Sequence, residues 1–292
     1  MNDLSRRSFL KASGAVAAAA CIGGDHLMAE RLKLPIGLQL YSVRNLLPKN
    51  FEGTLQQLGA AGYKEVEAAG YFDKTAAELG NALQKAGLKC ISTHHQLGQL
   101  KTQFDQLIEY GQALGLEYII CSWAGVHRDP TRTGDLNLDD WRYVADQFNE
   151  IGRKVKGAGM TFGYHNHIVE FGRENGVVFF DELLKRTDPK LVEFEMDCGW
   201  VTVGGGDPVA YLHKYPNRIS MLHLKDFKKA AKPFSPTAPP VPTELGRGSI
   251  DYGPIFAAAK KGTIKHYFVE QEAFDVPWEE SLKIDADYLR KL

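Results

Sequence analysis

The sequence predicts a single (β/α)8 barrel, and three observations lead to this fold class. From Pro35 onward, short β-branched or aromatic runs alternate with helical patterns, and together they make eight strand–helix units. Several of these runs end in polar side chains, where a barrel of this kind carries its chemistry. No GxGxxG turn follows an early strand, and this disfavours the alternative of an open, doubly wound sheet that binds a dinucleotide.

The predicted strands are separated by helical patterns of ordinary length. The strands cover residues 36–41, 63–68, 88–94, 116–121, 162–167, 191–197, 219–225 and 264–270. The helices predicted between the first five strands cover 51–61, 75–86, 100–114 and 138–158, and Gly87 and Gly115 are the expected caps of two of them. Because nothing indicates a repeat or a second domain, we expect residues 30–292 to form one barrel.

Charge and cysteine usage argue against a nucleic-acid-binding protein, a disulfide framework and a CxxC zinc site. The chain has 35 basic and 36 acidic residues, and the two signs are mixed throughout, so no polyanionic partner such as nucleic acid is indicated. The four cysteines, at positions 21, 90, 121 and 198, are widely spaced. They fit small core residues better than a disulfide framework or a CxxC zinc site.

The N-terminus resembles a twin-arginine export signal. Arg6 and Arg7 precede Phe-Leu-Lys and an alanine-rich run over 12–24, which is too short and too weakly apolar to span a membrane. We therefore expect residues 1–29 to be a signal peptide, cleaved after Ala29, and the mature protein to be periplasmic. Ala-Ala-Ala-Cys, ending at Cys21, is a weak match to a lipid-attachment box, which leaves a tether there as an alternative.

The stretch over 162–167 ends in two histidines that flank an amide. His165 and His167 are two positions apart, so on a strand they share a face. A barrel brings the ends of all its strands to one rim, where these histidines would meet other polar residues. Those residues are Glu67, His94, His95, Trp123, Asp197, His223, Lys225, Glu270 and Glu272. Imidazoles and carboxylates without cysteine suit manganese, magnesium, cobalt, iron or zinc in a site that is not a structural zinc site.

Six motifs make the chain similar to a known family. They are IGLQLYSVR, GYHNH, FEMDCGW, HLKD, ELGRGSID and FVEQE, spread over residues 36–272. Together they resemble the xylose-isomerase-like barrels, also known as sugar phosphate isomerases and epimerases, which share their fold with apurinic-site endonucleases. The resemblance covers roughly residues 35–292. It implies one divalent ion, with manganese preferred, held by His165, Asp197, His223 and Glu270.

One position departs from the pattern of that family. Many members carry Glu-Asn-His on the fifth strand, whereas this chain has His165-Asn166-His167. A histidine therefore stands where a carboxylate ligand would be. Epimerases of this kind use two glutamates on opposite faces of the substrate, so a symmetric two-glutamate reaction is put in doubt here.

The chemistry expected of such a site is proton abstraction. A divalent cation that chelates two neighbouring sugar oxygens makes the adjacent carbon-bound proton acidic enough for a nearby base. Neutral His167 is the expected base, with a pKa near working pH that needs no burial, and Glu270 is a second base. Lys225 and Glu67 are expected to bind hydroxyl groups. His95 is also assigned to the substrate pocket, although either it or His94 could pack behind the strand.

Other residues are expected to shape the substrate pocket. Trp123 and Trp200 are candidates for stacking on a sugar ring, although packing in the core explains each equally well. The proline-rich segment 226–247 is expected to run over the rim as part of the pocket wall, and Glu244 and Arg247 are expected to reach substrate from it.

Three functions follow, in order of preference. The first is a metal-dependent sugar isomerase or epimerase. The second is cleavage of a 3-keto-glycoside, in which the same proton abstraction is followed by departure of the glycosidic oxygen. The third is a periplasmic sugar-binding protein without catalysis. The expected partner is a small-molecule carbohydrate, with no nucleic acid and no membrane span, and a homodimer is left open.

Overall fold

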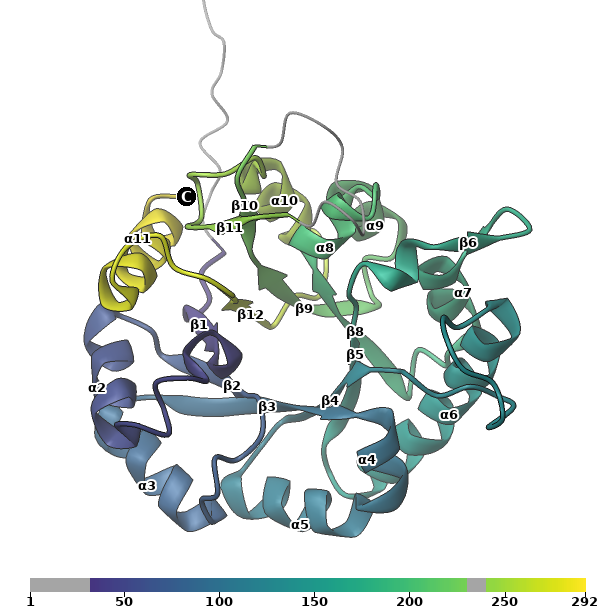
Figure 1. Ribbon diagram of the computed structural model, residues 1–292, viewed down its shortest axis with the longest axis horizontal. Coiled ribbons are helices and arrows are strands. Elements are labelled where there is room, and N and C mark those ends of the chain that lie inside the picture. Colours follow the sequence, from purple (N-terminus) through teal and green to yellow (C-terminus); the bar gives the residue numbers. More distant parts are fainter. Residues whose placement is uncertain (1–31, 230–239) are drawn as a thin grey trace, which may run out of the picture.

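The computed structural model describes residues 32–229 and 240–292 and confirms the predicted barrel (Figure 1). Eight parallel strands close into a ring in the order β1-β12-β9-β8-β5-β4-β3-β2. They are β1 (Gly37–Gln39), β2 (Glu65–Ala68), β3 (Lys89–Gln96), β4 (Tyr118–Trp123), β5 (Thr161–His165), β8 (Val192–Asp197), β9 (Ile219–Leu224) and β12 (His266–Val269). The predicted signal peptide, residues 1–29, lies outside the described residues, as do residues 230–239 of the proline-rich segment.

Helices surround the ring of strands (Figure 1). They are α2 (Phe51–Ala61), α3 (Ala76–Ala86), α4 (Leu97–Thr102), α5 (Phe104–Leu114), α6 (Leu138–Gly157), α7 (Phe179–Arg186), α8 (Cys198–Val203), α9 (Pro208–Lys214), α10 (Tyr252–Ala259) and α11 (Trp278–Lys291). Gly87 and Gly115 end α3 and α5 with φ of 68° and 75°, so both predicted caps are confirmed. The single helix predicted over 100–114 is instead α4 and α5. Gln103, with φ −127° and ψ 23°, separates them because it leaves the helical conformation.

The first and fifth strands each end two residues before their predicted ends. The first ends at Gln39, whose side-chain oxygen accepts the backbone N–H of Tyr41 at 3.0 Å and starts the 3-10 helix η1 (Leu40–Val43). The fifth ends at His165 instead of His167. After it, the 3-10 helix η2 (Val169–Phe171) and a short hairpin of β6 (Arg173–Glu174) and β7 (Val177–Val178) lead to α7.

The interior of the barrel is layered along its axis. Its lower half is an apolar plug separate from the main core, made of Ile91, Tyr118, Ile120, Met221 and Phe268. Glycine makes room for this plug, since a Cβ at Gly163 would lie 2.6 Å from Ile120 Cδ1 and one at Gly37 2.5 Å from Phe268 Cδ1. Alternation along the strands then places Glu67, His94 and Glu195 in a polar layer between the plug and the ends of the strands. This layer supports the rim.

The two ends of the described chain meet on one side of the ring. Leu32 and Leu34 lie beside Ala259 and Ile264, before the strands begin. At the other end, α11 packs on α2, and Arg290 Nη2 donates to the carbonyl oxygen of Ala61 at 2.7 Å. The first and last elements therefore close the ring from outside as well as through the pairing of β1 with β12.

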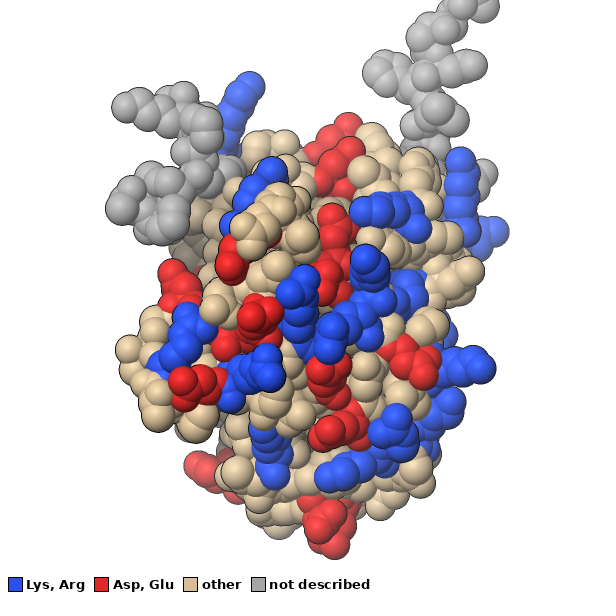
Figure 2. Space-filling view, turned by 90° about the vertical axis from the view of Figure 1, so that its right-hand side faces the viewer, with Lys and Arg blue, Asp and Glu red and all other residues tan. Residues whose placement is uncertain are grey.

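The charges on one face of the surface, and the length and hydropathy of the helices, can be described directly. On the face drawn in Figure 2, basic and acidic side chains are interspersed without a stripe of one sign. Within residues 32–229 and 240–292, no helix combines the length and apolar character needed to cross a membrane.

Candidate active site

Four side chains from the ends of four strands converge at the rim of the barrel. They are His165 from β5, Asp197 from β8, His223 from β9 and Glu270, which directly follows β12. All four are buried, and each offers a nitrogen or oxygen atom within 4.8 Å of those of the others. Convergence follows from the topology, because consecutive positions in the ring, β5-β8-β9-β12, bring these strand ends side by side.

Asp197 is held in place by hydrogen bonds, and one of its oxygens accepts no hydrogen bond from the part of the chain described. Its Oδ1 caps α8 by accepting the Trp200 N–H at 2.8 Å, and its own N–H donates to Asn166 Oδ1 at 3.1 Å. Among the described residues its Oδ2 accepts no hydrogen bond, although the Lys225 ammonium lies 3.1 Å away. Burial raises the pKa of Asp197 to about 6. This buried oxygen is ion-paired to Lys225 but accepts no hydrogen bond within the described chain, so it has lone pairs left for a metal ion.

Lys225 is the cation that this structure places among the carboxylates. Its Nζ lies 3.1 Å from Asp197 Oδ2, 3.1 Å from Glu270 Oε2 and 2.9 Å from Glu272 Oε1. Burial acts to lower the pKa of Lys225, but these acidic neighbours outweigh it and raise that pKa above its ordinary value. Burial likewise acts to raise the pKa of Glu270, and Lys225 and His223 reverse this, holding it well below its usual range.

Below the rim, two glutamates fix the orientation of three histidines. Glu195 Oε2 lies 2.8 Å from His94 Nε2, 3.1 Å from His165 Nδ1 and 3.2 Å from His223 Nε2. Because Nδ1 of His165 faces Glu195, its Nε2 is the atom that lies toward Asp197, 3.9 Å from Oδ2. Carboxylates behind ligating imidazoles commonly set their tautomer and direction.

Glu67 also belongs to this buried layer. Its Oε1 lies 2.8 Å from His223 Nε2 and 2.6 Å from His94 Nε2, and its Oε2 accepts from Ser92 Oγ at 2.6 Å. The prediction that Glu67 binds substrate hydroxyls gains no support from these contacts, and its side chain is completely buried. It contacts the back of His223 instead.

His167 lies on the cavity side of His165. The two rings have centroids 4.8 Å apart, and Trp123 and Trp200 lie 5.8 and 6.3 Å from the His167 ring. Burial, followed by the nearby Lys225 ammonium, lowers the pKa of His167 to about 3. The expectation of an unburied ring with a pKa near neutral is therefore wrong, although the ring is neutral as expected. Among the described residues, its Nδ1 is buried and has no hydrogen-bond partner.

A cavity of about 510 Å³ opens above the rim cluster, large enough for a sugar. His95, Trp123 and Trp200, all expected in the pocket, line it with His94, His165, His167, Glu270 and Glu272. His95 Nε2 also lies 3.2 Å from Tyr71 Oη. Tyr41, Gln96, Gln99 and Ser122 line the cavity as well, and the sequence did not single them out.

Two expected substrate contacts do not reach this cavity. Glu244 is buried beneath the loop, where it accepts from Ser281 Oγ at 2.9 Å, and Arg247 lies beside it with Nη1 3.5 Å from Oε2. Neither residue lines the cavity. The expected contacts of Glu244 and Arg247 with substrate stay predictions that this cavity does not support. The reason is that Asp226 accepts backbone N–H groups of residues 246, 248, 249 and 250 and folds this segment inward.

Sequence reasoning missed Glu195, the hub of the buried layer. The signal was available in the strand predicted over 191–197, where positions 193, 195 and 197 share a face with the expected ligand Asp197. With that support, two imidazoles and two carboxylates at the rim can hold a divalent metal ion. The residues present thus fit the ion that the strand-end pattern suggested.

Comparisons with known proteins agree with this geometry. A family model described as xylose isomerase-like TIM barrel matches residues 55–292, and one for the twin-arginine translocation signal matches residues 3–23. The chain is 28% identical over 263 residues to an inosose dehydratase of Clostridium beijerinckii, covering 79% of this chain and 86% of that protein. It is 29% identical over 237 residues to an inosose dehydratase of Geobacillus kaustophilus, covering 70% and 73%.

Among solved structures, the chain is similar to a sugar phosphate isomerase/epimerase from Parabacteroides distasonis. The TM-score is 0.75 with 30% sequence identity, covering 88% of this chain and 98% of that structure.

Proposed function

Because the chain belongs to the xylose isomerase-like TIM barrel family, we propose that it is a divalent-metal-dependent lyase acting on a keto-sugar. It would remove a proton beside the carbonyl group and expel the oxygen substituent of the next carbon. The observation that carries this proposal is the buried group of His165, Asp197, His223 and Glu270, which opens into a cavity beside the neutral ring of His167.

The four rim residues would hold the ion. A divalent cation bound there would polarise the carbonyl group and make the neighbouring C–H acidic. Glu195 supports this role by keeping Nε2 of His165 directed toward Asp197, and Glu67 does the same behind His223. Lys225 does not line the cavity itself, but its ammonium contacts Glu272 in the cavity wall, and we propose that it donates from there to a substrate oxygen.

His167 is the proposed base. Its Nδ1 takes the proton from carbon, the electron pair forms a C=C bond, and the C–O bond of the next carbon breaks. The same nitrogen then returns the proton to the departing oxygen, so the products are an unsaturated keto-sugar and either water or an alcohol. Burial keeps His167 neutral, and negative charge that develops on the substrate raises its pKa during the step. Glu270 is the second candidate base.

Elimination is preferred to isomerisation for two reasons. The curated relatives are named dehydratases, which is the class of reaction that expels an oxygen beside a carbonyl. In addition, His165 stands where a two-glutamate epimerase would need its second carboxylate. The leaving group can be a hydroxyl, or the glycosidic oxygen of a 3-keto-glycoside. Isomerase or epimerase activity is the second candidate, supported by the similarity to the Parabacteroides distasonis structure.

One NMR experiment separates these reactions. Purified, manganese-loaded mature protein is incubated in deuterated water with a cyclic keto-polyol, a 3-keto-disaccharide and a panel of free ketoses. New vinylic signals, with free sugar released from the disaccharide, are the expected result. Deuterium in the ketoses without elimination would favour the second candidate. No spectral change with any substrate, with metal confirmed in the protein, would contradict both elimination and isomerisation. The non-catalytic binding role would then remain.

His167→Asn provides the matching test of the base. It should lower the elimination rate by about 10²- to 10⁴-fold, which is the usual contribution of a positioned acid–base group. His213→Asn, a change on the exposed side of α9, is the control and should leave the rate unchanged. A similar rate for the His167 variant would move the role of base to Glu270.

The N-terminal signal supports export by the twin-arginine pathway. We propose the periplasm as the location of the mature protein, and the substrate would then be a sugar or glycoside available outside the cytoplasm. Residues 1–29 as the signal peptide and 30–292 as the barrel domain stay a prediction.

A further inference from the structure

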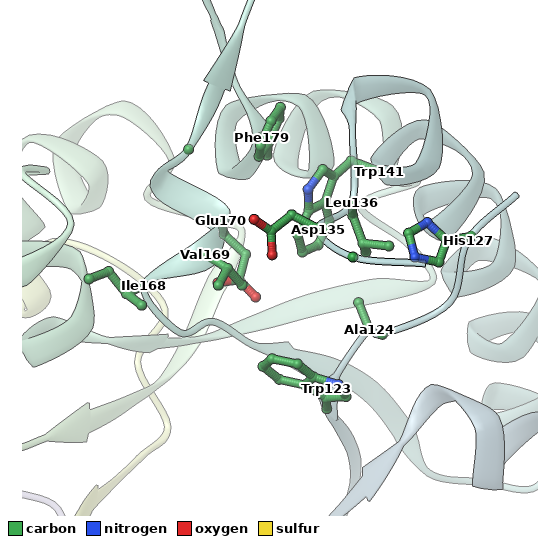
Figure 3. Close-up of a pocket in the computed structure, with 13 residues that line it drawn as sticks. Trp123, Ala124, His127, Asp135, Leu136, Trp141, Ile168, Val169, Glu170 and Phe179 are labelled. Carbon is green, nitrogen blue, oxygen red and sulfur yellow. The ribbon is translucent and has the colours of Figure 1, made fainter. Parts of the chain in front are cut away.

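A second cavity of about 480 Å³ adjoins the cavity above the four proposed metal ligands, which is called the metal cavity below. It lies between the segment 124–136, after β4, and the segment 168–172 around η2 (Figure 3). Figure 3 shows Trp123, Leu136, Trp141, Ile168, Val169 and Phe179 around it, so most of its lining is apolar. None of the four rim residues and neither His167 nor Lys225 lines it.

Trp123 connects the two cavities, because its indole lines both. His167, the proposed base, meets the indole edge-to-face with centroids 5.8 Å apart. Gly125 keeps the indole in this position: its φ is +27°, and a Cβ there would lie 2.4 Å from Trp123 Nε1. The backbone after β4 can therefore fold closely against the ring.

The second cavity also concentrates apolar surface that is open to solvent. Of the four large apolar side chains that are exposed among the described residues, Trp123 and Val169 both belong to it. Trp141 and Phe179, stacked at 5.9 Å with an interplanar angle of 22°, form the buried far wall. Exposed apolar surface in a hollow of this volume is characteristic of a small-molecule site.

We propose that this cavity binds the apolar, planar aglycone of a glycoside whose sugar ring occupies the metal cavity. The inference rests on the proposed function and deepens it by naming the substrate class, an aryl glycoside instead of a free sugar. The shared indole of Trp123 would contact the sugar on one side and the aglycone on the other. Flat aromatic walls favour a planar group, since aromatic rings pair by stacking or edge contact.

Equilibrium binding tests this without requiring catalysis. Metal-loaded mature protein is titrated calorimetrically with a phenolic β-glucoside and with methyl β-glucoside, both with an intact hydroxyl at carbon three. Burying an aromatic ring in an apolar cavity should make the phenolic compound bind about 10- to 100-fold more tightly. Equal affinities, or no binding of either glycoside, would overturn the inference, whatever the reaction turns out to be.

Val169→Asp probes the cavity itself. This exposed position tolerates a charge, and a carboxylate there should reduce the affinity ratio of the two glucosides to about one by placing a charge against the aglycone. Val241→Asp, also exposed but outside both cavities, is the matched control and should keep the ratio. Thermal unfolding checks that both variants fold.

Two further outcomes would overturn the inference. The first is an unchanged ratio in Val169→Asp. The second is a smaller particle for Val169→Asp than for the wild type in analytical ultracentrifugation, which would mean that a second copy of the chain covers the cavity. Cleavage of the 3-keto derivatives is measured separately, so failure of the lyase proposal is distinguishable from failure of the aglycone site.

Discussion

Lys225 places a buried ammonium within 3.1 Å of two of the four proposed metal ligands. The ammonium thereby offsets part of the negative charge of Asp197 and Glu270. A metal ion and the ammonium would then share one pair of carboxylates, so removal of the lysine should affect the metal-free and metal-bound protein differently.

Lys225→Met tests this balance. In the presence of a chelator, the variant should lose about 3–5 kcal/mol of unfolding free energy, since it leaves buried carboxylates unpaired. Added manganese should recover most of that loss because the ion supplies the missing charge. Urea denaturation with and without metal measures both values, and Lys228→Met, at an exposed pair with Asp275, is the control. An equal loss of unfolding free energy with chelator and with manganese would show that the ion does not replace the charge of the ammonium.

Glu195 acts on the site through the histidines that it contacts. Glu195→Gln should lower metal affinity by about 10- to 100-fold, because an amide cannot orient three imidazoles in the way that a carboxylate does. Titration of metal-stripped protein with manganese gives the affinity. Glu193→Gln is the matched control, on the same face of β8 but at the opposite end of the barrel beside Lys265. Comparable affinities for the two variants would assign Glu195 a purely structural role.

The rim could be predicted from the sequence, whereas the depth of the residues below it could not. His165, Asp197, His223 and Glu270 are each the last inward residue of a strand, and strand ends share a rim in any such barrel. Alternation gives the face of a residue but not its depth, which depends on strand tilt and on bulges such as the one between Val66 and Glu67. Glu67 was therefore assigned to the substrate although it lies beneath His223.

At the scale of elements, regular segments were predicted better than their connections. All eight strands lie within a few residues of their predicted positions, because hydrophobic periodicity is local. The path of a loop depends on distant partners. Glu244 was expected to reach substrate, yet Asp226 and α11 draw that segment inward, and Leu245 N–H donates to Asp285 on α11 at 2.7 Å.

Asp285 on α11, which accepts the Leu245 N–H of this loop, should make the free energy of unfolding depend on pH. Burial raises the pKa of Asp285 to about 8, so between roughly pH 4 and 8 the folded protein holds a proton that the unfolded chain has released. Stability should therefore fall as pH rises through this range, by up to about 1.4 kcal/mol per pH unit from this group. Asp285→Asn should flatten the slope between pH 6 and 8 and raise stability at pH 8.

Urea denaturation at several pH values measures that slope. The matched control is Asp287→Asn, two residues further along α11, where the exposed carboxyl has a lowered pKa because Lys283 bonds to it. That group is ionised in both states above pH 6, so the control should keep the wild-type slope. A slope that Asp285→Asn leaves unaltered would contradict the assignment.

At the scale of the whole molecule, the export signal and the barrel must work together, because the twin-arginine route carries folded proteins. Replacement of Arg6 and Arg7 by lysine keeps the charge but removes the arginine pair, which the export machinery reads as an address. The variant should remain in the cytoplasm with its leader attached, while the wild type is exported. Cell fractionation with intact-mass analysis measures both. Export of the variant at the wild-type level would show that another route is used.

Leu32 and Leu34 mark the end of the barrel at which the described chain begins. The chain enters β1 beside Ala259 and Ile264, where the strands begin, whereas His165, Asp197, His223 and Glu270 lie where the strands end. Residues 32–34, through which the chain enters the barrel, thus lie at the pole opposite to the four candidate metal ligands.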